Sequence, residues 1–171
     1  IIMVLRGRIE RDPLYSRLSA ALLFNDLYKD IFGVAEFEEE FLEKYRSSFY
    51  DAIRKGVECG RLHAQMLEFD FERLSQAISP ERDGLLKYLG AQTLYDRYFL
   101  RDYEQRHLEA PQYFWMRVAM GLALYETERE ERAIEFYNVM SGLYYVPSTP
   151  TLFHAGTKHP QMSSCFLTTV E

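Results

Sequence analysis

The residues best suited to chemistry lie in the last 25 positions of the sequence. Pro147–Gly156 carries hydroxyl side chains between and after two prolines, and Ser163 and Ser164 directly precede Cys165. Hydroxyls and free backbone N–H groups can hold a phosphate, and a thiol beside them can act as a nucleophile or a redox group. The alternative is a structural cysteine buried in a strand. The residue types alone leave both interpretations open.

The rest of the sequence offers little further chemistry. No His-Glu-x-x-His motif, glycine-rich phosphate loop or Ser-His-Asp arrangement occurs in it, and no metal site is predicted. Cys59 precedes Gly60 at an expected helix end, so we interpret it as structural or incidental. The scattered histidines are expected to be surface or loop residues; they are His63, His107, His154 and His159.

Hydrophobic spacing predicts helices as the elements that position this segment. Asp12 and Pro13 begin a helix that should reach Ile31, with Gly33 at its end. An aromatic stripe predicts a second helix, and its members are Phe37, Phe41, Tyr45, Phe49, Ile53 and Val57. Further helices are expected at residues 70–78, 79–89, 93–100 and 127–143, with a break at Gly90 and a polar connection at 101–110.

Two stretches depart from this amphipathic pattern. Pro111–Leu124 has almost no polar face, which predicts a fully buried helix in which Gly121 admits a close neighbour. After Gly142 two prolines argue against a helix over Val146–Thr151. Cys165–Val170 is rich in β-forming residues and reads as a strand.

Composition narrows the function classes. The 171 residues carry a net charge of −6 and are 47% hydrophobic, which suits one domain or slightly more. The acidic balance argues against non-specific DNA or RNA binding, and no apolar run suits a membrane span. Two cysteines are too few for a disulfide scaffold, so a reducing, cytoplasmic compartment is expected. The first and last residues suggest a piece of a larger protein.

Four blocks in a fixed order carry a resemblance. They are Asp12–Ser16, Tyr88–Tyr98, Pro111–Gly121, and the pair Ser148–Gly156 with Gln161–Leu167. Together they resemble the large (α) subunit of ribonucleotide reductase over most of the chain, from about residue 10 onward. The wording Ser-Thr-Pro-Thr-Leu-Phe with Ser-Ser-Cys-Phe-Leu favours the oxygen-dependent class, which reduces diphosphates. The alternatives are a cobalamin-dependent reductase and a stand-alone helical interaction module derived from the enzyme.

The resemblance implies a function for three residues. In the family a thiyl radical abstracts the 3′-hydrogen of the ribose, and a pair of cysteines supplies two reducing equivalents to replace the 2′-hydroxyl. Cys165 matches one redox-active cysteine of that pair, and its partner is expected downstream. Thr149 and Ser164 match substrate-binding positions beside it. Because the radical cysteine is also expected downstream, this segment alone should be inactive.

The resemblance also implies an architecture and partners. Residues 1–143 match the helical N-terminal region, and residues 144–171 match the substrate loop and first strand of a ten-stranded α/β barrel. The expected partners are a ribonucleoside diphosphate, the rest of the large subunit, a radical-generating dimetal small subunit, and thioredoxin or glutaredoxin. The family takes ATP and deoxynucleotide effectors for allosteric control of DNA precursor synthesis, and no cofactor is expected in this segment.

Overall fold

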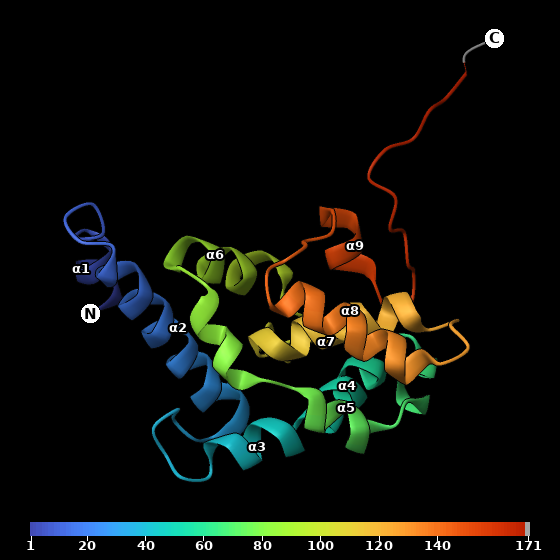
Figure 1. Cartoon of the computed structure of the whole chain (residues 1–171), viewed down its shortest axis with the longest axis horizontal. Coiled ribbons are helices and arrows are strands. Elements are labelled where there is room, and N and C mark those ends of the chain that lie inside the picture. The colour runs from blue at the N-terminus through green and yellow to red at the C-terminus, as the bar shows by residue number, and fades with distance from the viewer. Residues whose placement is uncertain (170–171) are drawn as a thin grey trace.

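The computed structural model describes residues 1–169, and this part of the chain is helical (Figure 1). Its α-helices are α1 Ile2–Arg6, α2 Leu14–Phe32, α3 Phe41–Ser47, α4 Phe49–Glu58, α5 Phe71–Ala77, α6 Tyr88–Thr93, α7 Pro111–Ala123, α8 Arg129–Ser141 and α9 Thr149–His154. Short 3₁₀ turns span Ala64–Glu68 and Pro80–Leu85, and a π-helical turn spans Leu94–Tyr98. β-structure within residues 1–169 amounts to two isolated bridges.

Helix α7 is the centre of the structure. Pro111 begins it, and eleven of its thirteen residues are buried, so the predicted core helix is confirmed. Helix α8 packs along it, while α4 and α9 contact other parts of its surface (Figure 1). A helix that buries all its sides must be enclosed by neighbours, and α7 therefore sets the positions of the helices around it.

Helix α2 forms where the sequence predicts, although it starts at Leu14, after Pro13, and ends at Phe32. The Asp12 carboxylate accepts a hydrogen bond from the backbone N–H of Leu14 at 2.8 Å, which satisfies a free donor at the helix start. Gly33 ends the helix in the left-handed region at φ 75°. None of the helices in the described part is both long and apolar enough to cross a membrane.

The helix predicted from the aromatic stripe is only partly correct. Phe41, Tyr45, Phe49 and Ile53 are buried, but Phe37 is 84% exposed and precedes α3. The Glu38 carboxylate accepts a hydrogen bond from the backbone N–H of Ala35 at 2.7 Å and fixes a turn there. The helix therefore starts at Phe41 rather than at Glu36. The backbone is interrupted again at Ser48, which separates α3 from α4.

Residues 79–100 differ from the helices predicted for them. Residues 79–89 were expected to be one helix, but they contain the 3₁₀ turn Pro80–Leu85 and the start of α6. Gly90 was expected to break a helix and instead lies within α6, where a modest glycine penalty is tolerated. The expected helix 93–100 is found as the end of α6 and a π-helical turn.

The C-terminal part corrects two further predictions. Thr149–His154 is helical although Pro150 lies in it, because a proline in the first turn lacks only an N–H that has no helical partner. The expected strand Cys165–Val170 is wrong for residues 165–169, which are exposed and irregular; Val170 lies outside the described residues. A strand needs a neighbouring strand to pair with, and residues 1–169 contain none.

A buried carboxyl group joins the elements around the start of α7. Asp83 Oδ2 accepts hydrogen bonds from the hydroxyls of Tyr28 at 2.5 Å and Tyr45 at 2.9 Å, and Oδ1 accepts one from Gln112 Nε2 at 2.6 Å. Tyr137 donates to Gln112 Oε1 at 2.6 Å. Burial raises the pKa of Asp83 to about 7, although its three hydrogen bonds act in the opposite direction.

This raised pKa predicts that stability falls as pH rises. An aspartate in an unfolded chain has a pKa of about 3.9, so between that value and about 7 the folded state binds the Asp83 proton more tightly. The contribution of Asp83 to the free energy of unfolding should therefore be complete below about pH 4 and decrease as pH rises toward 8, by a few kcal/mol. Urea denaturation at several pH values measures this slope.

The matched variant is Asp83→Asn, which cannot titrate and should flatten the slope. Burial lowers the pKa of His107, so that group acts in the opposite direction, but it is present in both proteins. The difference between the two pH profiles therefore isolates Asp83. Identical slopes would contradict this account of the buried carboxyl group.

The predicted close approach at Gly121 is also confirmed. A Cβ atom added there would lie 2.1 Å from the backbone nitrogen of Gly156 and 2.4 Å from the carbonyl carbon of Ala155. Gly156 itself adopts φ 76°. The backbone that follows α9 thus rests directly on α7, without an intervening side chain.

Two glycine substitutions should have opposite effects. Gly121→Ala forces two backbones apart and should destabilise the chain by about 2 kcal/mol or more. Gly90→Ala adds a methyl group on an exposed turn of α6 whose nearest atom is 3.6 Å away, and it should stabilise by about 0.5–1 kcal/mol. Thermal denaturation of both variants checks the pair. A neutral Gly121→Ala would refute the close contact.

Candidate functional site

Thr149 is the first residue of α9, and a tyrosine holds its side chain. The hydroxyls of Thr149 and Tyr98 are 3.1 Å apart and share a hydrogen bond. The Tyr98 ring stacks on Phe153 with centroids 4.5 Å apart and an interplanar angle of 12°. Tyr98 ends a π-helical turn, an irregularity that often occurs at functional sites. The Thr149 hydroxyl is therefore held in place by aromatic packing from another element.

A buried arginine anchors the other end of α9. Arg117, on α7, donates from Nη1 to the carbonyl oxygens of Leu152 at 3.1 Å and Ala155 at 3.0 Å. The last carbonyls of a helix have no partners within it, and a cation placed there satisfies them. The side chain of Arg117 is fully buried. This contact fixes α9 on α7 and, with it, the position of Thr149.

The charge of Arg117 is balanced by Glu109. Arg117 Nε lies 2.8 Å from Glu109 Oε1, and both side chains are buried. Glu109 Oε2 also accepts the backbone N–H of Leu100 at 2.8 Å. Two charges removed from water are stable only when paired and hydrogen-bonded, and here the carboxylate receives donors from both sides.

Ser164 and Cys165 lie in an exposed segment that follows α9. The Ser164 hydroxyl is 3.8 Å from the Cys165 sulfur, and the thiol is free and exposed. Within residues 1–169, no hydrogen bond joins either residue to Thr149. The described structure therefore does not bring the three predicted site residues together. Cys59, the other free thiol, is half-buried at the end of α4.

Two hydrogen bonds connect this segment to α9. The Thr151 hydroxyl donates to the carbonyl oxygen of Met162 at 3.2 Å. His154 Nδ1 lies 2.6 Å from the carbonyl oxygen of Gln161, which can only accept, so Nδ1 carries the proton. Residues 161–162 are therefore tied to the helix that carries Thr149, and Cys165 follows three residues later.

Sequence reasoning missed the roles of Tyr98, Glu109 and Arg117. The sequence places Tyr98 in an expected helix at 93–100 and Glu109 in the polar connection at 101–110, without a role for either. The sequence feature that points to these contacts is Arg117 itself, a charged residue in a helix with almost no polar face. Such a residue must be paired when it is buried, which predicts a carboxylate partner nearby.

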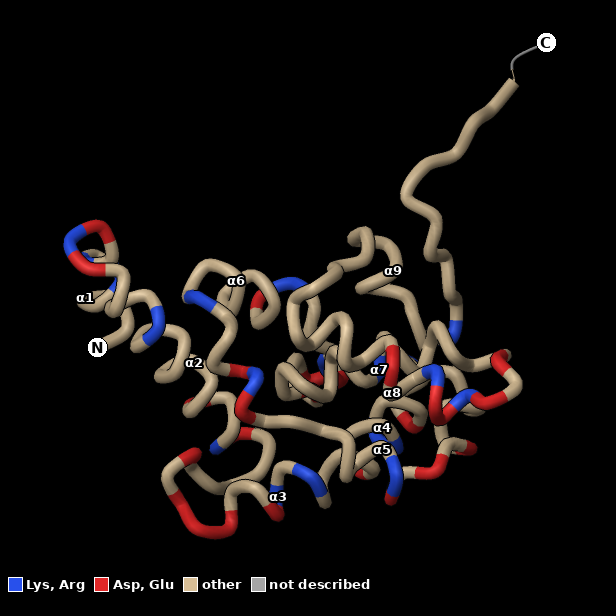
Figure 2. Tube along the Cα trace, in the orientation of Figure 1, with Lys and Arg blue, Asp and Glu red and all other residues tan. Residues whose placement is uncertain are grey.

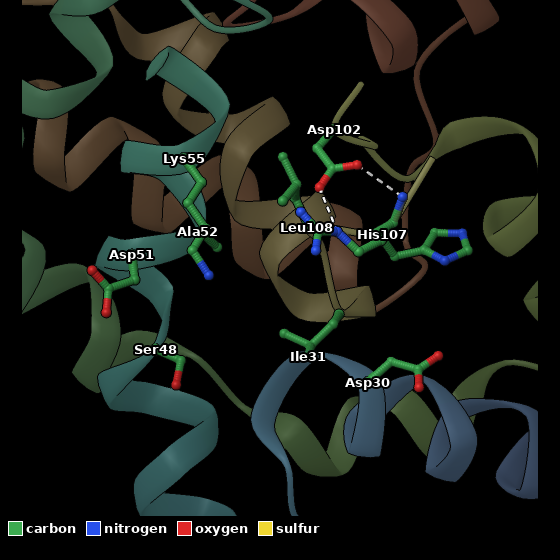
Figure 3. A pocket seen from close by; sticks show the side chains of 10 residues that line it. Asp30, Ile31, Ser48, Asp51, Ala52, Lys55, Asp102, His107 and Leu108 are labelled. Carbon is green, nitrogen blue, oxygen red and sulfur yellow. Dashed lines mark hydrogen bonds and ion pairs between the residues drawn. The ribbon is translucent and has the colours of Figure 1, made fainter. Parts of the chain in front are cut away.

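A cleft of about 380 Å³ lies between α2, α4 and the loop before α7, and Figure 3 shows the side chains that line it. Asp30, Asp51 and Lys55 line it, together with Asp102 and His107. The Asp102 carboxylate faces into the loop, where Arg106 donates to it from Nε at 2.8 Å and from the backbone N–H at 2.9 Å. The cleft holds charges of both signs, and it contains none of the residues predicted to be functional.

The sequence of this chain is similar to those of known proteins. Residues 84–160 match the family model described as the all-alpha domain of ribonucleotide reductase. The chain is 44% identical, over 171 residues and 99% of its length, to the ribonucleoside-diphosphate reductase subunit alpha of Chlamydia trachomatis. This chain belongs to the ribonucleotide reductase large-subunit family.

Other members of this family give similar matches. The alpha subunit of Helicobacter pylori is 39% identical over 91% of the chain, and the large chain of Schizosaccharomyces pombe is 44% identical over 58% of it. The chain spans only about a sixth of the Chlamydia relative, since it covers 16% of that protein. Tyr98, Glu109, Arg117 and Thr149 all fall within the range that matches the reductase family model.

The buried ion pair generates a prediction for this reductase segment. Arg117→Met leaves the Glu109 carboxylate buried without its cation and should cost about 3–5 kcal/mol of stability. The double variant Arg117→Met with Glu109→Gln removes both charges, so it should recover part of that loss. Urea denaturation of the wild type, the two single variants and the double variant completes the cycle. Strictly additive losses would contradict a coupled pair.

Proposed function

We propose that this chain is the helical N-terminal part of the large subunit of a ribonucleoside-diphosphate reductase, and that it contributes Thr149, Ser164 and Cys165 to the active site of that enzyme. The observation that carries the proposal is the 44% identity to a ribonucleoside-diphosphate reductase alpha subunit along 99% of the chain. We place the boundary between the helical region and the start of the catalytic barrel at residues 143 and 144.

Cys165 serves as one of two redox cysteines in this proposal. Its thiol and a second cysteine in the rest of the subunit each give up one hydrogen and form a disulfide. The ribose loses its 2′-hydroxyl as water and becomes a deoxyribose, so the two-electron oxidation of the thiols balances the reduction of the sugar. The exposure of the Cys165 thiol supports this role, because both the substrate and an external dithiol must reach it.

Thr149 and Ser164 contact the substrate in this proposal. The Thr149 hydroxyl is oriented by Tyr98 at 3.1 Å and lies on a helix that Arg117 anchors. A substrate-binding group gains from such support because misplacement by a fraction of an ångström weakens positioning. Ser164 precedes the thiol directly and gives the segment a second hydroxyl.

The proposed partners follow from the subunit assignment. They are a ribonucleoside diphosphate as substrate, the remainder of the large subunit, a radical-generating small subunit, and thioredoxin or glutaredoxin as reductant. ATP and deoxynucleotides act as allosteric effectors elsewhere in the enzyme. The compartment is the cytoplasm, where a reducing environment keeps the Cys165 disulfide in turnover.

A chimaeric enzyme tests the proposal. This chain replaces the matching segment of the Chlamydia trachomatis alpha subunit, and formation of deoxyribonucleotide is measured with the partner subunit of that enzyme. We expect activity that Cys165→Ser abolishes, because a serine cannot form the disulfide. The matched control is Cys59→Ser, which removes the other thiol of the chain and should leave turnover intact.

Two results would overturn the assignment. A chimaera that folds and binds its partner subunit without reducing any ribonucleotide would favour a stand-alone interaction module instead. Full activity of Cys165→Ser under dithiol-dependent conditions would show that this thiol is not the redox group.

A further inference from the structure

A basic hollow of about 270 Å³ lies beside α9, where Phe153 and Tyr98 line it. It is separate from the cleft of Figure 3, since the two share no lining residue. The hollow is lined by Arg61, Asp96, Arg97, Tyr98, Phe99, Leu100, Arg101, Gln105 and Phe153.

Three arginines from separate places in the sequence line this hollow. Arg61 comes from the turn after α4, Arg97 from the π-helical turn, and Arg101 from the loop that follows it. Within residues 1–169, none of the three has a carboxylate oxygen within 4.0 Å. By contrast, several other arginines of this chain form ion pairs, namely Arg54, Arg73, Arg106, Arg117, Arg129 and Arg132.

The local structure orients these groups. Arg101 Nη2 donates to the carbonyl oxygen of Tyr95 at 3.0 Å, which leaves other N–H groups of the fork available. The Arg61 guanidinium lies over the Tyr103 ring, 5.3 Å from its centroid. Gln105 adopts φ 64°, a conformation that non-glycine residues seldom take and that recurs where a loop is shaped for function.

One acidic residue also lines the hollow. Asp96 Oδ2 accepts a hydrogen bond from Gln92 Nε2 at 2.8 Å, so this carboxylate is already engaged by a neighbouring amide. Three cations against one anion give the hollow an excess of two positive charges. Acidic residues gather elsewhere in this chain of net charge −6, in Glu36–Glu40 and Glu126–Glu131 (Figure 2).

We propose that this hollow is an anion site that binds a diphosphate group. Guanidinium forks match phosphate oxygens in geometry as well as charge, and a bound anion removes the repulsion among three neighbouring cations. Whole small-molecule sites commonly occupy about 300–1,000 Å³, so a hollow of about 270 Å³ suits the diphosphate part of a ligand. The inference stands independently of the roles proposed for Thr149 and Cys165.

Calorimetric titration of this chain with inorganic pyrophosphate tests the proposal. We expect saturable binding that weakens as salt concentration rises. Arg97→Ala should reduce affinity about tenfold through the loss of a charge-assisted contact. Arg97 is the preferred first variant because it is exposed and its side chain forms no hydrogen bond or ion pair within residues 1–169. The matched control is Arg46→Ala, which removes an equal charge from α3, outside the hollow.

Titration with adenosine diphosphate tests whether the bound diphosphate group belongs to a nucleotide or to a free oligophosphate. Binding tighter than that of pyrophosphate assigns the site to a nucleotide, and equal binding assigns it to a free oligophosphate; both support the anion site. An absence of pyrophosphate binding by the wild type overturns the proposal. Equal losses in Arg97→Ala and Arg46→Ala also overturn it, since they reduce the effect to net charge. Circular dichroism verifies that both variants fold.

Discussion

The buried ion pair between Arg117 and Glu109 is the contact on which the candidate site depends. Helix α7 is almost wholly enclosed, so a charge on it would be prohibitive without compensation. The guanidinium compensates by reaching Glu109 Oε1 at 2.8 Å and two carbonyl oxygens of α9 at 3.0 and 3.1 Å. One side chain thereby joins the loop before α7, the core helix and the helix that carries Thr149.

Steric complementarity reinforces this electrostatic contact. The backbone at Gly156 rests on Gly121 so closely that no β-carbon fits between them. Arg117 and Gly121 are four residues apart and lie on the same face of α7. The charge satisfies the end of α9, and the glycine admits the backbone that follows it. Both features place α9 in one position, because a shift of a single turn would lose the hydrogen bonds and create a clash.

The helices that the sequence predicted well are those in which the local sequence pattern and the packing of the folded chain favour the same structure. The helix ending at Gly33, the apolar helix from Pro111 and the helix carrying Ala133 and Tyr137 all combine regular hydrophobic spacing with a clear start or end. The resemblance named the correct family, but it could not supply the contacts of the family's residues in this chain.

The failed predictions have identifiable physical causes. The two prolines predict no helix at Val146–Thr151, but a first-turn proline such as Pro150 fits a helix, and Arg117 binds the carbonyl oxygens at its far end. Phe37 continued the aromatic spacing, but the hydrogen bond from Ala35 to Glu38 created a turn. The strand expected from Cys165 was inferred from β-propensity alone, which reflects packing against neighbours rather than an intrinsic backbone preference.

The two polar clusters within this apolar core stabilise their buried carboxyl groups in different ways. The cluster around Asp83 joins α2, α3 and the start of α7 through uncharged donors, and burial raises the pKa of its carboxyl group to about 7. The Arg117 cluster instead holds a full ion pair one to two turns further along. A protonated carboxyl group can be accommodated by tyrosines and an amide, whereas an arginine cannot lose its charge and requires a permanent anion. The charged cluster is therefore the more demanding of the two, and it is the one that contacts the helix carrying Thr149. The exposed segment after α9 has no such support. Hydrogen bonds of Thr151 and His154 connect it to that helix. The position of Cys165 relative to Thr149 therefore depends on how residues 163–165 continue from those two hydrogen bonds.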